Sequence, residues 1–107
     1  ALERDARGSV TLAGSTRADL AYALGFAHAQ DRWFQMDLLR RAAAGELSAL
    51  MGRATLDFDR ELRPHRFRAV ARAALERASG EQRATLEAYA AGANAGLASL
   101  RARPFEY

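Results

Sequence analysis

A long run without proline, residues 17–44, constrains the fold more than any other part of the sequence. Ser15 or Thr16 can cap its first turn, because a hydroxyl at this position accepts a hydrogen bond from a free backbone N–H. Asp19 lies in the first turn, where a negative charge favours the positive end of a helix dipole. The sequence therefore predicts one long helix over residues 17–44.

This helix is expected to be apolar on two opposite faces. At about 100° per residue, one stripe consists of Leu20, Leu24, Ala27, Phe34 and Leu38, and the roughly opposite side carries Phe26, Trp33, Met36 and Arg40. A helix of this kind is normally buried from both sides, whereas the chain supplies only two further helices to cover it. The pattern indicates that a packing partner lies outside the sequence.

The composition supports this interpretation. Half of the 107 residues are apolar, but 26 are alanines, against 5 Phe, 3 Tyr and 1 Trp. Alanine removes little area from water on burial, and a single domain of this size has little stability to spare. The chain is therefore expected to need a partner.

The first fourteen residues are predicted to form a β-hairpin. Residues 2–5 and 9–13 suit extended segments around a turn in which Gly8 can adopt a positive φ. Because two isolated strands are only marginally stable, the hairpin is expected to join a sheet of a partner chain. We accordingly divide the chain into a hairpin, 1–14, and a helical segment, 15–107.

The rest of the helical segment is expected to contain short and long helices. Gly45 interrupts the long helix, and residues 46–51 suit one or two helical turns that end at Gly52. A loop that contains Asp57 and Asp59 is expected next.

Pro64 fits the first position of an amphipathic helix that extends to Ala78. Ser79 and Gln82 have the spacing of a capping box that begins a last helix, whose apolar stripe continues until Pro104. The predicted fold class is mainly α, with a short N-terminal β-hairpin and three to four helices.

Several classes of function are disfavoured by composition. There is no Cys and there are two His, which is too few for a histidine-built zinc site. All 16 basic residues are arginines, yet 13 carboxylates leave a net charge of only +3, which supports nucleic-acid binding weakly. No stretch approaches the ~18–20 apolar residues of a membrane span. The opening residues form neither a signal peptide nor a start methionine, so the chain is expected to be processed.

Asp31 is the first candidate for chemistry. It falls within the apolar stripe, where a carboxylate needs a cation or several donors, and His28 and Gln35 flank it at helical spacing. It is either a general acid or base, or a buried structural carboxylate paired with an arginine. We prefer the structural interpretation, because ion pairs also perturb pKa values and no nucleophile lies nearby in the sequence.

Arg40 and Arg41 form a second candidate group that suits an anion site. Asp37 lies three and four residues before them, so local ion pairs are the simpler interpretation. Asp31, Arg32, Asp37, Arg40 and Arg41 are therefore predicted to be structural or interface ion-pair residues. No Ser or Thr lies in a nucleophile elbow or near a spaced His and acid, and no metal ligands are predicted.

Specific residues resemble a known family. The segments Ala29-Gln30-Asp31-Arg32, Phe34-Gln35-Met36 and Arg40-Arg41, within residues 19–41, resemble the first long helix of the penicillin acylase (penicillin amidase) family. The resemblance continues through residues 44–52, at Asp59 and Arg63, and at residues 89–95. Residues 4–8 resemble its opening strand and turn, although Ser9-Val10 stands where that family usually has Pro-His.

The resemblance implies an αββα N-terminal-nucleophile hydrolase. In this family one precursor cuts itself into a small α chain and a large β chain. The nucleophile is the serine at the N-terminus of the β chain, and its own α-amino group is the base. The present chain resembles the first part of the α chain, which implies that it holds no catalytic residue and is inactive alone.

The resemblance also implies a periplasmic or secreted location and, in the complete enzyme, calcium, with no cofactor held by this chain. The expected partners are the β chain and a small N-acyl substrate, with neither nucleic acid nor membrane. Family members deacylate β-lactams such as penicillin G, or N-acyl-homoserine lactones. The Gln-Asp-Arg and Arg-Arg elements resemble the penicillin acylase branch more closely.

Two alternatives rest on bulk features. The chain could be an independent helical interaction module, which would melt cooperatively alone. It could instead be an arginine-rich nucleic-acid-binding domain, whose affinity would fall steeply with salt.

Overall fold

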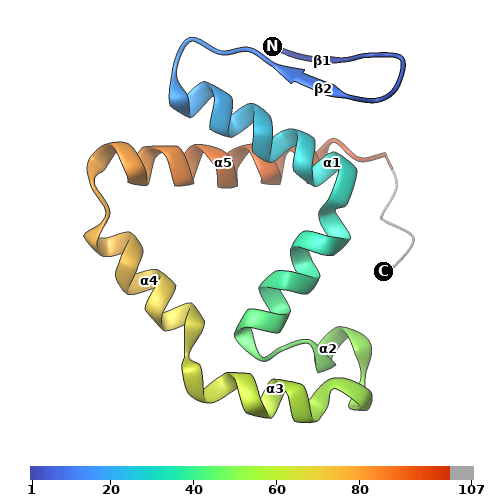
Figure 1. Ribbon diagram of the computed structural model, residues 1–107, viewed down its shortest axis with the longest axis vertical. Helices are drawn as coiled ribbons and strands as arrows, with labels where there is room; N and C mark the ends of the chain where they lie inside the picture. Colours follow the sequence, from blue (N-terminus) through green and yellow to red (C-terminus); the bar gives the residue numbers. More distant parts are fainter. Residues whose placement is uncertain (102–107) are drawn as a thin grey trace. The chain divides into compact units, whose positions relative to one another are not determined.

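The computed structural model describes residues 1–101, and these are mainly helical with one short hairpin (Figure 1). The strands are β1 (Leu2–Arg4) and β2 (Val10–Leu12), the α-helices are α1 (Arg17–Ala44), α2 (Ser48–Met51), α3 (Leu56–Leu62), α4 (Phe67–Arg77) and α5 (Gly80–Ala98), and two 3₁₀ turns are η1 (Arg53–Thr55) and η2 (Arg63–His65). The predicted fold class is confirmed. The predicted limit of the last apolar stripe, Pro104, lies outside the described residues.

The chain divides into two compact units. The first contains Ala1–Trp33 and the described residues from Ser79 onward, and the second contains Phe34–Ala78. The first unit therefore holds the hairpin, the N-terminal part of α1 and α5, and the second holds the rest of α1 with the short helices and α4.

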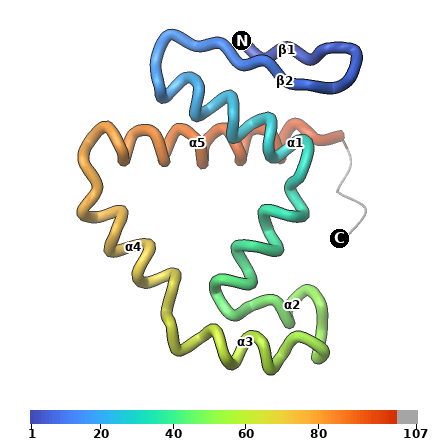
Figure 2. The backbone as a smooth tube through the Cα atoms, viewed as in Figure 1, coloured from blue at the N-terminus to red at the C-terminus, as the bar shows by residue number. Residues whose placement is uncertain are grey.

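The hairpin formed by β1 and β2 is present as predicted (Figure 2). Its strands are antiparallel, and Leu2 lies opposite Leu12. The Asp5 carboxylate accepts hydrogen bonds from the backbone N–H groups of Arg7, at 2.9 Å, and Ser9, at 2.8 Å. Gly8 has φ +83°, a conformation that glycine adopts without steric cost. These local contacts reverse the chain, whereas the joining of the hairpin to another sheet stays a prediction.

The bounds of α1 agree with the sequence prediction, and two reciprocal hydrogen bonds between side chains and backbone cap its first turn. The Asp19 N–H donates to the Thr16 hydroxyl at 3.1 Å, and the Thr16 N–H donates to the Asp19 carboxylate at 3.0 Å. The helix is not regular throughout, because Arg32 has φ −149° and ψ 34° and interrupts it. Neither proline nor glycine adjoins Arg32, so no residue beside it predicts the interruption.

Within the first unit, α1 and α5 lie side by side and run in the same direction (Figure 1). Glycines allow the two backbones to meet. A Cβ atom on Gly25 would collide with the Tyr89 carbonyl oxygen, and one on Gly92 would collide with that of Tyr22. The buried apolar side chains of the described residues are all alanines, namely Ala21, Ala27, Ala29 and Ala93. The apolar core of the described residues is therefore thin, which agrees with the alanine-rich composition.

Two sequence predictions for the second unit are wrong. Asp57 and Asp59 do not lie in a loop but in the first turn of α3, where their charges favour the helix dipole. Pro64 does not begin the next long helix but lies in η2, and α4 begins at Phe67 after Arg66, which has φ +51°. Tertiary contacts to Asp59, which periodicity does not show, favour the helical conformation here.

Two helix ends in the chain follow the sequence prediction. Gly52 ends α2 with φ +77° and donates its N–H to the Ser48 carbonyl oxygen. Ser79 and Gln82 form the predicted capping box at the start of α5. The apolar stripe of α4 is present but uncovered among the described residues, since Phe67 is 45% and Val70 57% exposed.

Candidate functional site

Asp31, the first candidate from the sequence, pairs with an arginine of the hairpin. Arg4 donates two hydrogen bonds to its carboxylate, at 2.7 and 3.1 Å. The expected burial of Asp31 is wrong for the described residues, because its side chain is 37% exposed. The reason is that the apolar stripe around it is only partly covered, since Ala27 is buried but Leu20 and Leu24 are each 39% exposed.

His28 is half-buried and turned towards α5. Its Nδ1 atom lies 2.9 Å from the Tyr89 hydroxyl, and the two rings meet edge to face with centroids 5.9 Å apart. Gln35, the other neighbour of Asp31 in the sequence, is exposed and belongs to the second unit. The structure therefore engages His28 with an aromatic hydroxyl rather than with a carboxylate.

A cleft of about 300 Å³ lies between the hairpin turn and α1, and Ser9, His28 and Asp31 are among the residues that line it. These three residue types form hydrolytic relays elsewhere, but only when hydrogen bonds connect them in order. Here His28 bonds to Tyr89 and Asp31 to Arg4, and no hydrogen bond within residues 1–101 joins Ser9 to His28. Within residues 1–101, hydrogen bonds do not connect these three side chains as a relay.

Asp37 is buried, with 4% of its side chain exposed, and two arginines hold it. Arg40 donates from Nε at 3.0 Å and Arg41 from Nε at 2.8 Å. These are the contacts that the spacing of three and four residues favours. The paired guanidinium groups compensate for the lost hydration of the carboxylate. Arg32, by contrast, has no ion-pair partner among the described residues of its own unit.

Asp59 is a buried carboxylate whose hydrogen bonds were not predicted from the sequence. It is fully buried and accepts hydrogen bonds from the backbone N–H groups of Leu47, at 2.8 Å, and Ser48, at 2.7 Å. Burial acts to raise the pKa of Asp59, but hydrogen bonds from Ser48 and Leu47 and the charge of Arg63 outweigh it and lower the pKa. The carboxylate of Asp59 in α3 thus caps the start of α2, the α-helix that precedes it along the chain.

Two further contacts hold the segment that precedes α2. Arg68 donates to both carboxylate oxygens of Glu46, at 2.8 and 2.9 Å, and Arg63 donates to the Gly45 carbonyl oxygen at 2.9 Å. The hydrogen bonds to Arg68 lower the pKa of Glu46, and those to Glu46 raise the pKa of Arg68. Charged side chains therefore organise this unit.

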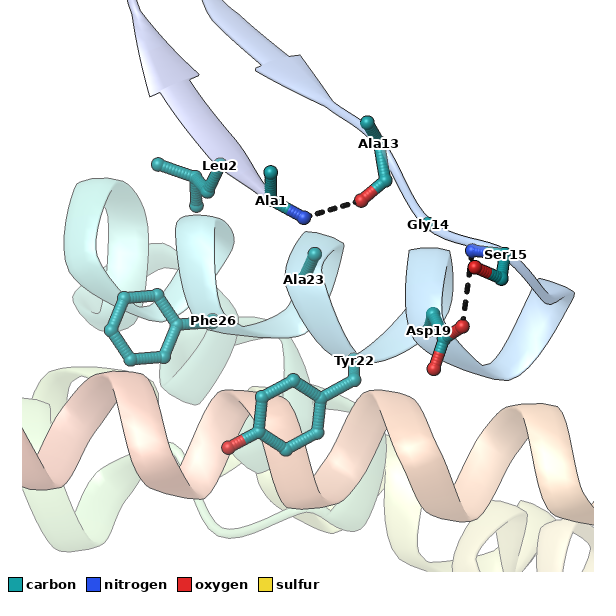
Figure 3. Close-up of a pocket in the computed structure, with 9 residues that line it drawn as sticks. All are labelled: Ala1, Leu2, Ala13, Gly14, Ser15, Asp19, Tyr22, Ala23 and Phe26. Atoms are coloured by element: carbon teal, nitrogen blue, oxygen red, sulfur yellow. Dashed lines mark hydrogen bonds between the residues drawn. The ribbon is translucent and has the colours of Figure 1, made fainter.

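A larger hollow of about 520 Å³ lies between the hairpin and α1 (Figure 3). Its walls are mainly apolar, with Leu2, Tyr22 and Phe26 as the large side chains. Asp19, its one carboxylate, also accepts a hydrogen bond from the Ser15 N–H at 3.1 Å. The hollow offers shape and apolar surface rather than reactive groups.

Residues 1–101 bring together no group of three or more His, Asp or Glu side chains that could hold a metal ion. In the same part of the chain, no helix is both long enough and apolar enough to span a bilayer.

Comparison with known proteins decides the family. All of residues 1–107 match the penicillin amidase family. The chain belongs to this family. Within the penicillin amidase family it corresponds to the N-terminal part of the α chain, as the resemblance predicted.

Its relatives include more than one kind of acylase. The chain is 41% identical over 106 residues to a penicillin acylase 2 proenzyme of a Pseudomonas species. This match covers 99% of the chain. It is 36% identical over 100 residues to an acyl-homoserine lactone acylase of Pseudomonas aeruginosa, covering 94% of the chain. The chain spans only 14% and 12% of the lengths of these relatives.

A solved structure agrees with these sequence matches. A thermostable penicillin G acylase from Alcaligenes faecalis matches with a TM-score of 0.84 at 32% identity, covering 100% of this chain and 57% of that chain. The penicillin amidase fold of the chain is therefore shown both by sequence and by structure.

Proposed function

We propose that this chain is the non-catalytic scaffold part of an acylase that hydrolyses the amide bond of N-acyl compounds. The observation that carries the proposal is the match of the whole chain to penicillin acylases in both sequence and structure. The absence of an activated nucleophile among the described residues supports the scaffold role, because amide hydrolysis needs one.

The nucleophile is proposed to be the serine that opens a larger β chain from the same precursor. A serine at a chain terminus has an α-amino group beside its hydroxyl, and this amine can accept the hydroxyl proton as the serine attacks the acyl carbon. The amine of the substrate then leaves, and water releases the acyl group as a carboxylic acid.

The proposed substrates are penicillin-type β-lactams in the first place and N-acyl-homoserine lactones in the second. Both are N-acyl amides, and relatives of both kinds match the chain. We place the mature enzyme in the periplasm or outside the cell. Calcium is proposed for the complete enzyme only, and no step above depends on it.

The test uses the complete protein that contains this chain. Denaturing gels and intact mass spectrometry should find a companion chain that is much larger and begins with Ser. The purified protein should release the acid from penicillin G or from an N-acyl-homoserine lactone, and replacement of that serine by Ala should abolish both hydrolysis and self-cleavage. A chain that is found alone and monomeric, without hydrolysis of either substrate, would contradict the proposal and favour a helical interaction module.

A further inference from the structure

The cleft beside the hairpin turn has an unbalanced charge. It is lined by Gly8, Ser9, Val10 and Leu12 of the hairpin and by Leu24, Ala27, His28, Asp31 and Arg32 of α1. Asp31 is bound by both terminal nitrogens of Arg4, so this pair contributes no net charge. Arg32 is the remaining charged group of the lining, and it leaves the cleft with one positive charge.

No neighbour along the helix neutralises Arg32. A helical arginine finds its local partners three and four residues away. Those positions hold His28, Ala29, Gln35 and Met36, and none of them is a carboxylate. The backbone of Arg32 departs from helical geometry, with φ −149° and ψ 34°, so helical spacing places only His28 and Ala29, which precede it, beside Arg32.

The geometry points to a carboxylate as the ligand of this cleft, and we propose that Arg32 binds it. A guanidinium group matches the two oxygens of a carboxylate through parallel N–H donors. Ser9 is on the facing hairpin and offers a hydroxyl as a further donor. A volume of about 300 Å³ admits a carboxylate with a short side chain.

The charge balance selects a carboxylate over a phosphate group. One uncompensated arginine neutralises a monoanion, whereas a phosphate carries a charge of about −1.5 to −2 near pH 7. The ligand is therefore either a free small carboxylate or an Asp or Glu side chain from protein outside this chain.

Arginine-specific labelling of the complete protein separates these two sources. Phenylglyoxal modifies accessible guanidinium groups, and peptide mass spectrometry measures the rate of modification at each arginine separately. Arg72 is the control, because it is an exposed arginine of α4 without an ion-pair partner among the described residues of its own unit. Labelling is compared in sodium acetate and in sodium chloride at equal ionic strength. A ligand slows the reaction by 1 + [L]/Kd, which is about threefold at about 100 mM acetate if Kd is about 50 mM.

A free-carboxylate site is supported if acetate slows labelling at Arg32 but not at Arg72. A side-chain carboxylate is supported if Arg32 is protected in both salts and Arg32→Gln lowers the Tm more than Arg72→Gln does, with the difference shrinking at high salt. The proposal is overturned if Arg32 reacts like Arg72 in both salts. It is also overturned if Arg32 is protected but Arg32→Gln costs no more stability than Arg72→Gln.

Discussion

Gly25 of α1 and Tyr89 of α5 approach so closely that no side-chain carbon fits between them. A Cβ atom on Gly25 would overlap the Tyr89 carbonyl oxygen and lie 2.9 Å from the Ala93 nitrogen. Gly92 has the same relationship to Tyr22, three residues before Gly25. Because the obstacles are backbone atoms, a rotamer change cannot relieve them, and the helices must separate to admit a methyl group.

Gly25→Ala should therefore destabilise the protein, by about 1–3 kcal/mol, the usual cost of forcing extra atoms into a packed site. Gly92→Ala should act in the same way. The check is the Tm of the complete protein, measured by calorimetry, beside the soluble yield.

Gly80→Ala is the matched control. This glycine begins α5, and a Cβ atom on it meets nothing within 4 Å. Alanine is the better helix former, so the change should be neutral or slightly stabilising. Equal losses of Tm for Gly25→Ala and Gly80→Ala would show that backbone contact between α1 and α5 is not what these glycines provide.

Asp59 should make the second unit sensitive to acid. Its pKa is lower in the folded protein than the ordinary value of 3.8, because hydrogen bonds and the Arg63 charge outweigh burial. A lowered pKa contributes stability that is present above the ordinary value and is lost as the pH falls through the folded value. Asp59→Asn should lower the Tm at pH 7 and flatten its decline below about pH 4.

Asp57→Asn is the control for this change, since Asp57 lies on the same helix and its side chain is 91% exposed beside Arg60. It should leave the Tm at pH 7 nearly unchanged. Glu46 also has a lowered pKa, so Asp59→Asn should remove only part of the acid sensitivity. If the two Asn variants have the same Tm from pH 3 to 7, Asp59 does not stabilise α2 as the structure indicates.

The pair of Arg4 and Asp31 should contribute little, despite its bidentate geometry. The two side chains are 35% and 37% exposed, and solvent screens such pairs. A double-mutant cycle of Arg4→Gln and Asp31→Asn should give a coupling energy of about 0.2–1 kcal/mol that falls with added salt. A coupling well above this range, unaffected by salt, would indicate that the pair is buried in the complete protein.

Local signals in the sequence were sufficient for the starts of two helices. The start of α1 and the capping box of α5 follow from side chains that bond to backbone within four residues. The role of Asp59 could not be predicted in this way, because its partners Leu47 and Ser48 lie 12 and 11 residues away. Only the folded chain brings them together.

The burial of Asp31 was wrong for a different physical reason. Periodicity identifies the face on which a residue lies, but not whether another element covers that face. The described residues bury Ala27 but leave Leu20 and Leu24 39% exposed, so the stripe that holds Asp31 is only partly covered within this part of the chain. Its pairing with Arg4 joins residues 27 positions apart, which helical spacing does not show.

Exposed apolar side chains in both units predict how the chain behaves alone. Large apolar side chains remain exposed, among them Leu39 at 73%, Val70 at 57% and Leu86 at 55%, while the buried apolar side chains of the described residues are alanines. Alanine burial supplies too little free energy to offset the entropy of ordering a chain of this length. We expect the isolated 107-residue chain to aggregate or to unfold without a cooperative transition, measured by circular dichroism on heating. A sharp, reversible transition of a monomer would instead support the independent helical module, since that alternative requires the chain to be stable without a partner.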